Sequence, residues 1–340
     1  MLEVLTRPQG SPNHQYVFTQ CLRAWKGSRV DGVVFVYSRQ VAQQTASLVD
    51  EQLFVLGALR PAPVVVVMDG SIGVSDDLLD DDEAELRARL EYFGLDGNGA
   101  PIVRTSADVV LRGTEPWASE FRSVQDVMDR TFLPLEREGR DRLMVSSSVP
   151  RLGGSSTPKS RALTKSSAGR PVVHAFVLQG ELRINDEVDL VVSNQVHRMR
   201  ARKLEDAQRH PAERIERGHW AAVELAGATP RTTAGVSVAL VHPRSLRSSR
   251  SLTVSVSHMW QQGRGITVPD FQRGQTLLVT TSPGCLPPHL CRVVLVDRRA
   301  NDIVLMLESQ HAILTDRFDL SGPVILRGGG TAVAQVIESL

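Results

Sequence analysis

The first part of the chain alternates between short apolar runs and longer segments with a helical repeat. Continuous apolar runs are typical of strands buried on both faces, and apolar residues recurring every three or four positions predict amphipathic helices. The pattern predicts strands at 32–37, 64–68 and 102–106 and helices at 44–59, 76–92 and 117–135. Strands that alternate with helices indicate a parallel sheet with crossover helices. Residues 1–145 are therefore predicted to form an α/β domain.

Residues 146–170 interrupt this pattern. The segment is rich in serine, glycine, proline and positive charge, and its apolar residues show no repeat. Such a composition is typical of an exposed connection rather than of a packed element. We therefore expect a flexible linker or loop here.

Beyond residue 170 the apolar residues alternate with polar ones in short runs that are joined by polar turns. The runs lie at 172–178, 188–192, 220–225, 236–241, 252–256, 275–280, 292–296, 303–307, 324–326 and 331–337. Many short strands at regular spacing are typical of small β-barrels or sandwiches. We expect one barrel over residues 171–245 and a second over residues 246–340.

The composition is that of a protein with ordinary packed cores. Hydrophobic residues make up 41% of the 340 positions and charged residues 23%. No apolar run approaches the roughly 20 residues that a membrane-spanning helix needs, so no membrane partner is expected. Three cysteines do not make a disulfide framework, which favours a reducing compartment.

The net charge of +1 conceals an uneven distribution along the chain. Residues 1–150 carry 15 arginines and lysines against 22 acidic residues, whereas residues 151–250 carry 17 against 9. A basic middle third indicates an anionic partner. Alternatively, the basic excess pairs with the acidic first third across a domain interface, and the sequence leaves both readings open.

Five stretches resemble, in order and spacing, the translation elongation factor Tu family. The segment DGVVFVYSRQVAQQT resembles the family's DGAILVVSAADGPMPQT, and QGELRINDEVDLVV resembles RGKVKVGDEVEIVG of its second domain. The stretches lie at 31–45, 59–70, 90–107, 179–192 and 324–340. The resemblance implies an α/β GTPase-like domain, here truncated, that is followed by two small β-barrel domains.

The resemblance also implies that the phosphate-binding part of the nucleotide site is missing. The family's P-loop precedes the DGVVFVY-like strand by more chain than the 30 residues found here. The family's DCPGH turn falls at Gly10 to His14, so Gly10 replaces the metal-linked aspartate and Asn13 the phosphate-sensing glycine. His14 matches the family's catalytic histidine. The sequence GGSSTPKS at 153–160 is a near match to a P-loop, but its proline removes a needed N–H donor.

The guanine-reading elements are also altered. The family's NKxD begins at Asp69, and Ile72 replaces the final aspartate that accepts hydrogen bonds from the base. Only Ser106 and Ala107 match the family's SA element, and tight packing explains a small pair there equally well. We therefore expect a degenerate, non-catalytic relative that binds no nucleotide cofactor.

The sequence does not favour a zinc site. Cys285, His289 and Cys291 offer three ligands, whereas a structural zinc site takes four. Two prolines between the first two ligands favour a hairpin loop instead. We expect no metal.

The basic residues of the middle third are the remaining candidates for function. Arginine forks suit phosphate groups, and the family's second and third domains help to hold tRNA and contact the ribosome. A solvated charged surface is the alternative. The predicted RNA-binding residues are Arg198, Arg200, Arg202, Lys203, Arg209, Arg244, Arg247 and Arg250.

The sequence therefore predicts a non-catalytic Tu-like protein that acts in ribosome assembly or on the ribosome. The expected partners are ribosomal RNA, ribosomal or assembly-factor proteins and, as a further candidate, tRNA; DNA is not expected. The expected compartment is the mitochondrial matrix, otherwise the cytoplasm. Two alternatives stay open: a tRNA-binding elongation-type factor that works without its own nucleotide, and an active GTPase of which this chain is a part.

Overall fold

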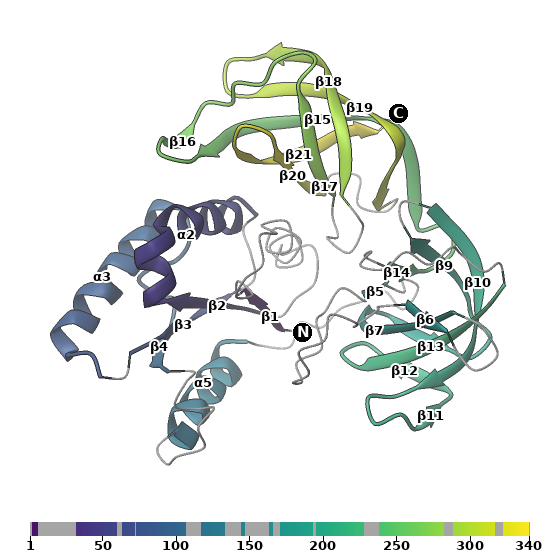
Figure 1. Cartoon of the computed structure of the whole chain (residues 1–340), viewed down its shortest axis with the longest axis horizontal. Coiled ribbons are helices and arrows are strands. Elements are labelled where there is room, and N and C mark those ends of the chain that lie inside the picture. The colour runs from purple at the N-terminus through teal and green to yellow at the C-terminus, as the bar shows by residue number, and fades with distance from the viewer. Residues whose placement is uncertain are drawn as a thin grey trace.

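The chain forms an α/β domain followed by two β domains (Figure 1), which confirms the predicted fold class. This description rests on a computed structural model. The described residues are 2–5, 32–59, 63–71, 73–106, 117–132, 144–146, 163–165, 171–192, 195–227, 238–281, 288–316 and 322–339.

The α/β domain contains a four-stranded parallel sheet with the order β1-β2-β3-β4. Its central strands are the apolar runs of the sequence, and their side chains are buried because helices cover the sheet. The sequence pattern does not predict β1, because four residues are too few to show a repeat. The strands are β1 (Leu2–Leu5), β2 (Gly32–Ser38), β3 (Val64–Asp69) and β4 (Ile102–Thr105).

Three helices accompany this sheet: α2 (Arg39–Leu59), α3 (Asp76–Tyr92) and α5 (Trp117–Thr131). The bounds of α3 agree with the prediction, whereas α2 begins five residues earlier than predicted and α5 ends four residues earlier. Gly32 permits the close approach of the residue after α5, since a Cβ on Gly32 would lie 2.0 Å from Cδ1 of Phe132.

The second domain is a curved antiparallel sheet in which each strand pairs with its neighbours along the path β11-β10-β13-β7-β5-β14-β9. Pairing of β9 with β10 joins the two ends of the curved part, so the inward side chains form one core. The strands β8 and β12 pair separately. The strands are β5 (Met144–Ser146), β6 (Leu163–Lys165), β7 (Pro171–Gln179), β8 (Glu181–Arg183), β9 (Glu187–Val192), β10 (Gln195–Glu205), β11 (Pro211–Ala212), β12 (Arg214–Glu216), β13 (Trp220–Gly227) and β14 (Val238–Val241).

Part of the expected linker at 146–170 is strand. Leu163–Lys165 form β6 and pair with β7, and β5, which ends at Ser146, also pairs with β7. These short strands carry little apolar repeat of their own, and tertiary pairing decides their conformation. The rest of that segment, 147–162 and 166–170, lies outside the described residues.

The third domain is a closed antiparallel barrel. Its strand order is β16-β15-β19-β18-β17-β20-β21, and pairing of β15 with β21 closes the ring. The sequence pattern predicts only the middle of β15, because serines and arginines make up most of its first six residues. The strands are β15 (Leu246–Gln261), β16 (Gly265–Thr267), β17 (Thr276–Thr281), β18 (His289–Arg298), β19 (Ile303–Asp316), β20 (Pro323–Arg327) and β21 (Thr331–Ser339).

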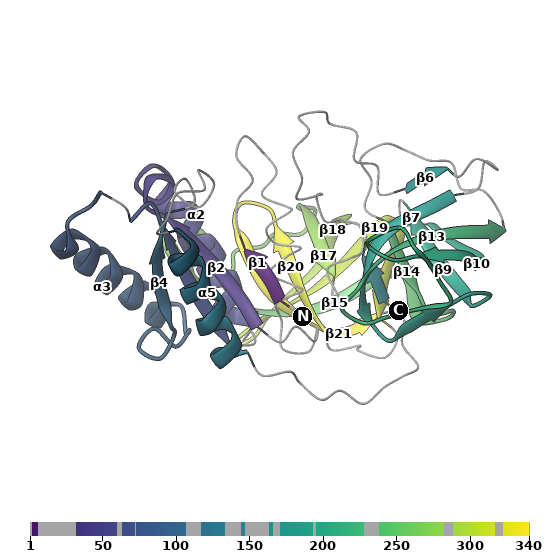
Figure 2. The same cartoon turned by 90° about the horizontal axis from the view of Figure 1, so that it is seen from below.

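The α/β domain packs against the third domain through α2, which contacts β21 and β15. Trp260 and Ile325 of the barrel belong to the same buried cluster as the core of the α/β domain. Glu51 of α2 is 6% exposed; its carboxylate accepts a hydrogen bond from the hydroxyl of Thr331 and lies 3.9 Å from a guanidinium nitrogen of Arg327. In both overall views the α/β domain and the second domain lie at opposite ends of the molecule (Figures 1 and 2).

This shared core generates a stability prediction for the indole of Trp260. Trp260 is 6% exposed, whereas Trp220 of the second domain is 38% exposed and provides a matched control. Trp260→Ala should lower the free energy of unfolding by about 3–5 kcal/mol, because it leaves a cavity between two domains. Trp220→Ala should cost less. Urea unfolding followed by far-ultraviolet circular dichroism measures both, and equal losses would contradict the shared core.

Candidate nucleic-acid interface

The outer face of β10 carries half of the eight predicted RNA-binding residues. Met199 and Ala201 point into the core of the second domain, so their neighbours Arg198 and Arg200 point to solvent. The sequence does not predict β10, because charged residues outnumber the apolar ones that mark its inner face. The strand converts a basic cluster in the sequence into a basic row on one surface.

A β-bulge interrupts this row at Arg202. Ala201 pairs with Leu225 and Lys203 pairs with Glu224, so Arg202 is the extra residue with no partner opposite it. A bulge leaves one residue outside the ladder and redirects its side chain. Arg202 and Lys203 are consequently both exposed, although they are neighbours in one strand.

Three basic residues of β10 pair with acidic residues of their own domain. Two lie opposite carboxylates of β9: Arg198 binds Asp189, and Arg200 lies 3.7 Å from Glu187. Lys203 lies 2.6 Å from Glu205. The hydrogen bond to Asp189 raises the pKa of Arg198 above its ordinary value. For these three residues the acidic partners belong to the second domain and not to the acidic first third of the chain.

Asp189 connects β10 to the turn that leads into the third domain. Asp189 is 4% exposed. One carboxylate accepts hydrogen bonds both from the guanidinium of Arg198 and from the backbone N–H of Arg244, the latter at 3.0 Å from Oδ2. A buried carboxylate needs such donors, because its charge has lost the solvation of water. Asp189 therefore brings together two basic segments that are 46 positions apart.

A small apolar cluster lies at the same junction. Val191, Ala239 and Val241 of the second domain pack against Leu314 of the third, with Leu246 beside them. The junction between the two β domains thus combines an apolar contact with the hydrogen bonds of Asp189.

Arg244, Arg247 and Arg250 are exposed at this junction and along the first residues of β15. Among the described residues, none of the three has a carboxylate within ion-pair distance. Arg209 is also exposed, but it lies in the turn between β10 and β11, where its backbone N–H donates to the carbonyl of Asp206. The eight predicted residues therefore fall into three groups. Arg198, Arg200 and Lys203 on β10 pair with carboxylates, whereas Arg202, Arg244, Arg247 and Arg250 do not. Arg209 lies apart from both groups, in its turn.

The described positions that the resemblance assigns to the guanine site lie at the carboxyl edge of the parallel sheet. Asp69 ends β3 and Ser106 follows β4. Between them, Ser71 is buried; its hydroxyl donates to the carbonyl of Met68 at 3.0 Å, and its backbone N–H donates to that of Thr105 at 3.1 Å. The described part of this edge is therefore closed by its own hydrogen bonds. The remaining positions, Gly10, Asn13, His14, Ile72 and Ala107, lie outside the described residues.

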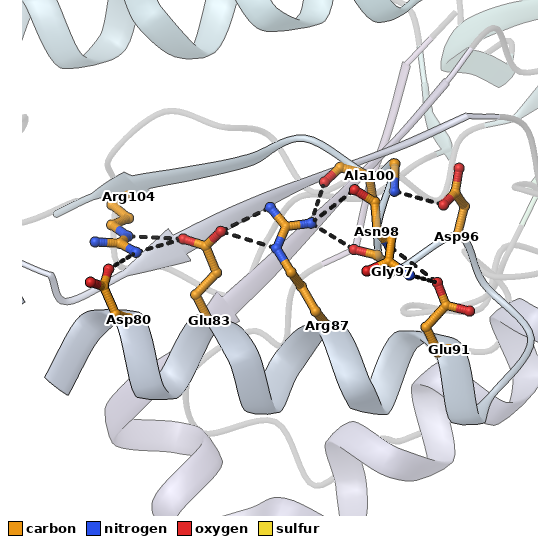
Figure 3. Close-up of polar contacts among 10 residues, drawn as sticks. Asp80, Glu83, Arg87, Glu91, Asp96, Gly97, Asn98, Ala100 and Arg104 are labelled. Atoms are coloured by element: carbon orange, nitrogen blue, oxygen red, sulfur yellow. Dashed lines mark hydrogen bonds and ion pairs between the residues drawn. The ribbon is translucent and has the colours of Figure 1, made fainter. Parts of the chain in front are cut away.

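The acidic start of α3 takes part in a polar network (Figure 3). Glu83 joins two arginines: it accepts from Arg104 of β4 at 2.7 Å and from Arg87 at 2.8 Å. Arg87 also donates to the carbonyl oxygens of Gly97 at 2.6 Å and of Ala100 at 3.1 Å. The network fastens α3 to the sheet and to the turn that follows the helix, which is a structural role. Further ion pairs join Asp80 to Arg104 and Asp82 to Arg39.

Two of the three zinc candidates lie in the wall of the third barrel. His289 and Cys291 are buried at alternate positions of β18, and Cys285 lies outside the described residues. The Nε2 atom of His289 accepts from the backbone N–H of Leu314 at 3.4 Å. Burial lowers the pKa of His289 to about 4 and raises that of the Cys291 thiol to about 12. In the described part of the chain, no group of three metal-binding side chains occurs, and no helix has the length and apolarity to cross a membrane.

Comparison with solved structures identifies the class of fold. The chain is similar to a bacterial selenocysteine-specific elongation factor, EF-Sec, with a TM-score of 0.65 and 15% identity over 96% of this chain and 47% of that one. It is also similar to the apo form of translation elongation factor SelB from Methanococcus maripaludis, with a TM-score of 0.67 and 12% identity over 97% of this chain and 69% of that one.

The chain therefore shares its fold with these two solved elongation factors. It spans about half the length of EF-Sec and about two thirds of the length of SelB. No protein-family model matches the sequence.

The buried imidazole of His289 generates a prediction about pH. Its pKa in the folded protein is about 4, below the ordinary 6.5, so its contribution to stability is complete above pH 6.5 and is lost as the pH falls toward 4. Between pH 7 and pH 5 this residue should remove about 2 kcal/mol from the free energy of unfolding. His289→Gln should flatten the dependence over that interval.

The exposed His311 provides a matched control, because it lies on β19 of the same barrel. His311→Gln removes an exposed imidazole from the same barrel, so it controls for the loss of one histidine. Urea unfolding at pH 7, 6 and 5 measures all three proteins. A fall in stability that is as steep in His289→Gln as in the wild type would show that another group titrates.

Proposed function

We propose that this protein is a translation-factor-like protein that binds ribosomal RNA or ribosomal particles through its two β domains. The observation that carries the proposal is the exposed basic surface where the second domain meets the third. The guanidinium of Arg198 on β10 and the backbone N–H of Arg244, in the turn before β15, both donate to the buried Asp189, which brings the two basic segments together. Guanidinium groups bind phosphate oxygens with paired hydrogen bonds, and a phosphate backbone is the anion that such an extended surface fits best.

The elongation-factor fold supports this proposal. EF-Sec and SelB are named as elongation factors, and the present chain is similar to them in fold over 96% and 97% of its length. Within this class of fold, a role in ribosome assembly fits a protein that binds RNA and catalyses no reaction.

The mitochondrial matrix is the compartment that we propose for this role, with the cytoplasm as the alternative. Fluorescence microscopy of the tagged full-length protein distinguishes the two.

We further propose that the protein works without guanine-nucleotide chemistry of its own. The sequence has Ile72 where the family has the aspartate that reads the base. The neighbouring Ser71 uses its hydroxyl and its backbone N–H inside the protein. A site that has lost its acceptor to a hydrocarbon side chain leaves the guanine edge unpaired, which costs about 1–3 kcal/mol for each lost hydrogen bond.

Titration with a fluorescent guanine nucleotide tests the loss of this chemistry. We expect no saturable binding at micromolar protein concentrations, with or without Mg²⁺. The same titration in EDTA identifies signal that does not depend on the metal. Saturable, Mg²⁺-dependent binding would contradict this proposal and would favour the alternative that the chain is part of an active GTPase.

Sedimentation with ribosomal particles tests RNA binding. The wild-type protein should sediment with particles at low salt and should be released as salt rises, because each phosphate contact releases condensed counterions. Affinity should vary little among RNA sequences, as expected for contacts to the backbone rather than to bases. Absence of the protein from the particle fraction at low salt, together with no binding to structured RNA in free solution, would defeat the proposal.

A further inference from the structure

Three of the four unpaired arginines of the basic surface occupy irregular backbone positions, whereas Arg247 lies at a regular position opposite Thr315. Arg202 is the extra residue of the bulge in β10, and Arg250 falls where the pairing of β15 with β19 shifts between Ser249 and Ser251. Arg244 has a φ of 64°, in the left-handed region. By contrast, Arg198 and Arg200 lie at regular positions of β10, opposite acidic residues. Among the described residues, the arginines at these three irregular positions have no carboxylate partner, and neither has Arg247 at its regular position.

The left-handed conformation of Arg244 has an energetic cost. A residue with a Cβ loses about 1 kcal/mol in this region, which glycine occupies freely. The hydrogen bond from the N–H of Arg244 to Asp189 holds the turn in place at 3.0 Å. Outliers of this kind persist where the surrounding structure fixes them, and they concentrate at functional sites.

The shift in β15 is closed by local hydrogen bonds. The hydroxyl of Ser249 donates to the carbonyl of Ser251 at 2.5 Å, and the N–H of Ser251 donates back to that hydroxyl at 3.1 Å. Ser249 is buried, whereas Arg250 between the two serines is exposed. Arg247 and Arg250 are three residues apart, which corresponds to about 10 Å along a strand. That spacing lets the two guanidinium groups reach separate phosphates of one nucleic-acid strand.

Ion pairing decides which basic residues can bind a further anion. A phosphate that approaches Arg200 must displace Glu187 or remain beside it, and the same holds for Lys203 and Glu205. Either event costs free energy, because a carboxylate loses its partner or a like charge comes near. Arg202, Arg244, Arg247 and Arg250 meet no such competitor in the described part of the chain.

We propose that Arg202, Arg244, Arg247 and Arg250 form the phosphate-contacting surface for structured RNA, and that Arg198, Arg200 and Lys203 stabilise the second domain instead. Asp189 acts as a positioning residue, since it holds the turn that carries Arg244 against β10. The proposal rests on the proposed function, and it divides one basic surface into binding residues and structural residues.

Two matched double variants test this division. Arg247→Gln with Arg250→Gln removes two unpaired charges, and Arg200→Gln with Lys203→Gln removes two paired charges from the same surface. The overall charge changes equally, so any difference between them reports geometry. Binding to a fluorescent RNA hairpin is measured from 50 to 300 mM salt, and melting temperatures are measured in parallel.

The unpaired double variant should lose about 1.8 units of the slope of log K against log salt, which corresponds to a roughly sixtyfold weaker affinity at 0.1 M salt. Its melting temperature should match that of the wild type. The paired double variant should change the slope by less than about one unit. Equal losses in both variants, or a larger loss in the paired one, would overturn the division and leave the proposed function intact. Failure of the wild type to bind the hairpin or ribosomal particles would defeat the proposed function itself.

The Arg244→Gly variant distinguishes a role of Arg244 in RNA binding from a role in the stability of the fold. Glycine takes the left-handed conformation without strain, and the backbone N–H that Asp189 needs is kept. The variant should have a melting temperature equal to or above that of the wild type and should lose about one unit of salt slope. Unchanged affinity with a lower melting temperature would assign Arg244 a structural role and remove it from the surface.

Discussion

The need to satisfy a buried carboxylate governs both junctions of the third domain. Glu51 on α2 accepts from Thr331 of the barrel, and Asp189 on β9 accepts from the backbone of Arg244, which begins the chain's passage into the barrel. Each carboxylate has lost most of its contact with water, so separating the domains would remove a donor from a buried charge. The two interactions give each junction a preferred geometry, while the apolar contacts around them contribute most of the stability.

The two junctions differ in how they hold the third domain against its neighbours. The α/β domain shares a core with the third domain, so packing fixes its position relative to that domain. At the other junction, the hydrogen bonds of Asp189 set the position of arginines from two domains relative to one another. A surface built across a junction in this way can meet an extended anion, because its charges belong to rigid strands and a constrained turn.

The arginines of the basic surface differ in backbone conformation and in whether they pair with a carboxylate. Regular strand positions place Arg198 and Arg200 opposite acids on β9, where cross-strand pairs stabilise a sheet. The bulge at Arg202 and the left-handed turn at Arg244 free neighbouring arginines from that pairing. Residues of one type, within a few positions of one another, therefore differ in their electrostatic surroundings.

The sequence by itself determined the elements with a strong repeat. The apolar runs of β2 and β3, the helix α3 and the order of an α/β domain before two β domains follow from hydrophobic patterning, since burial on one or both faces leaves its period in the chain. Only the tertiary structure decided that the basic segment 197–203 belongs to the strand β10 and that Leu163–Lys165 pair with β7. It also decided which arginines meet a carboxylate, because Asp189 and Arg198 become partners through strand register and Arg244 joins them through a turn 55 positions beyond Asp189. Such contacts depend on pairing between distant segments, and no local pattern encodes that pairing.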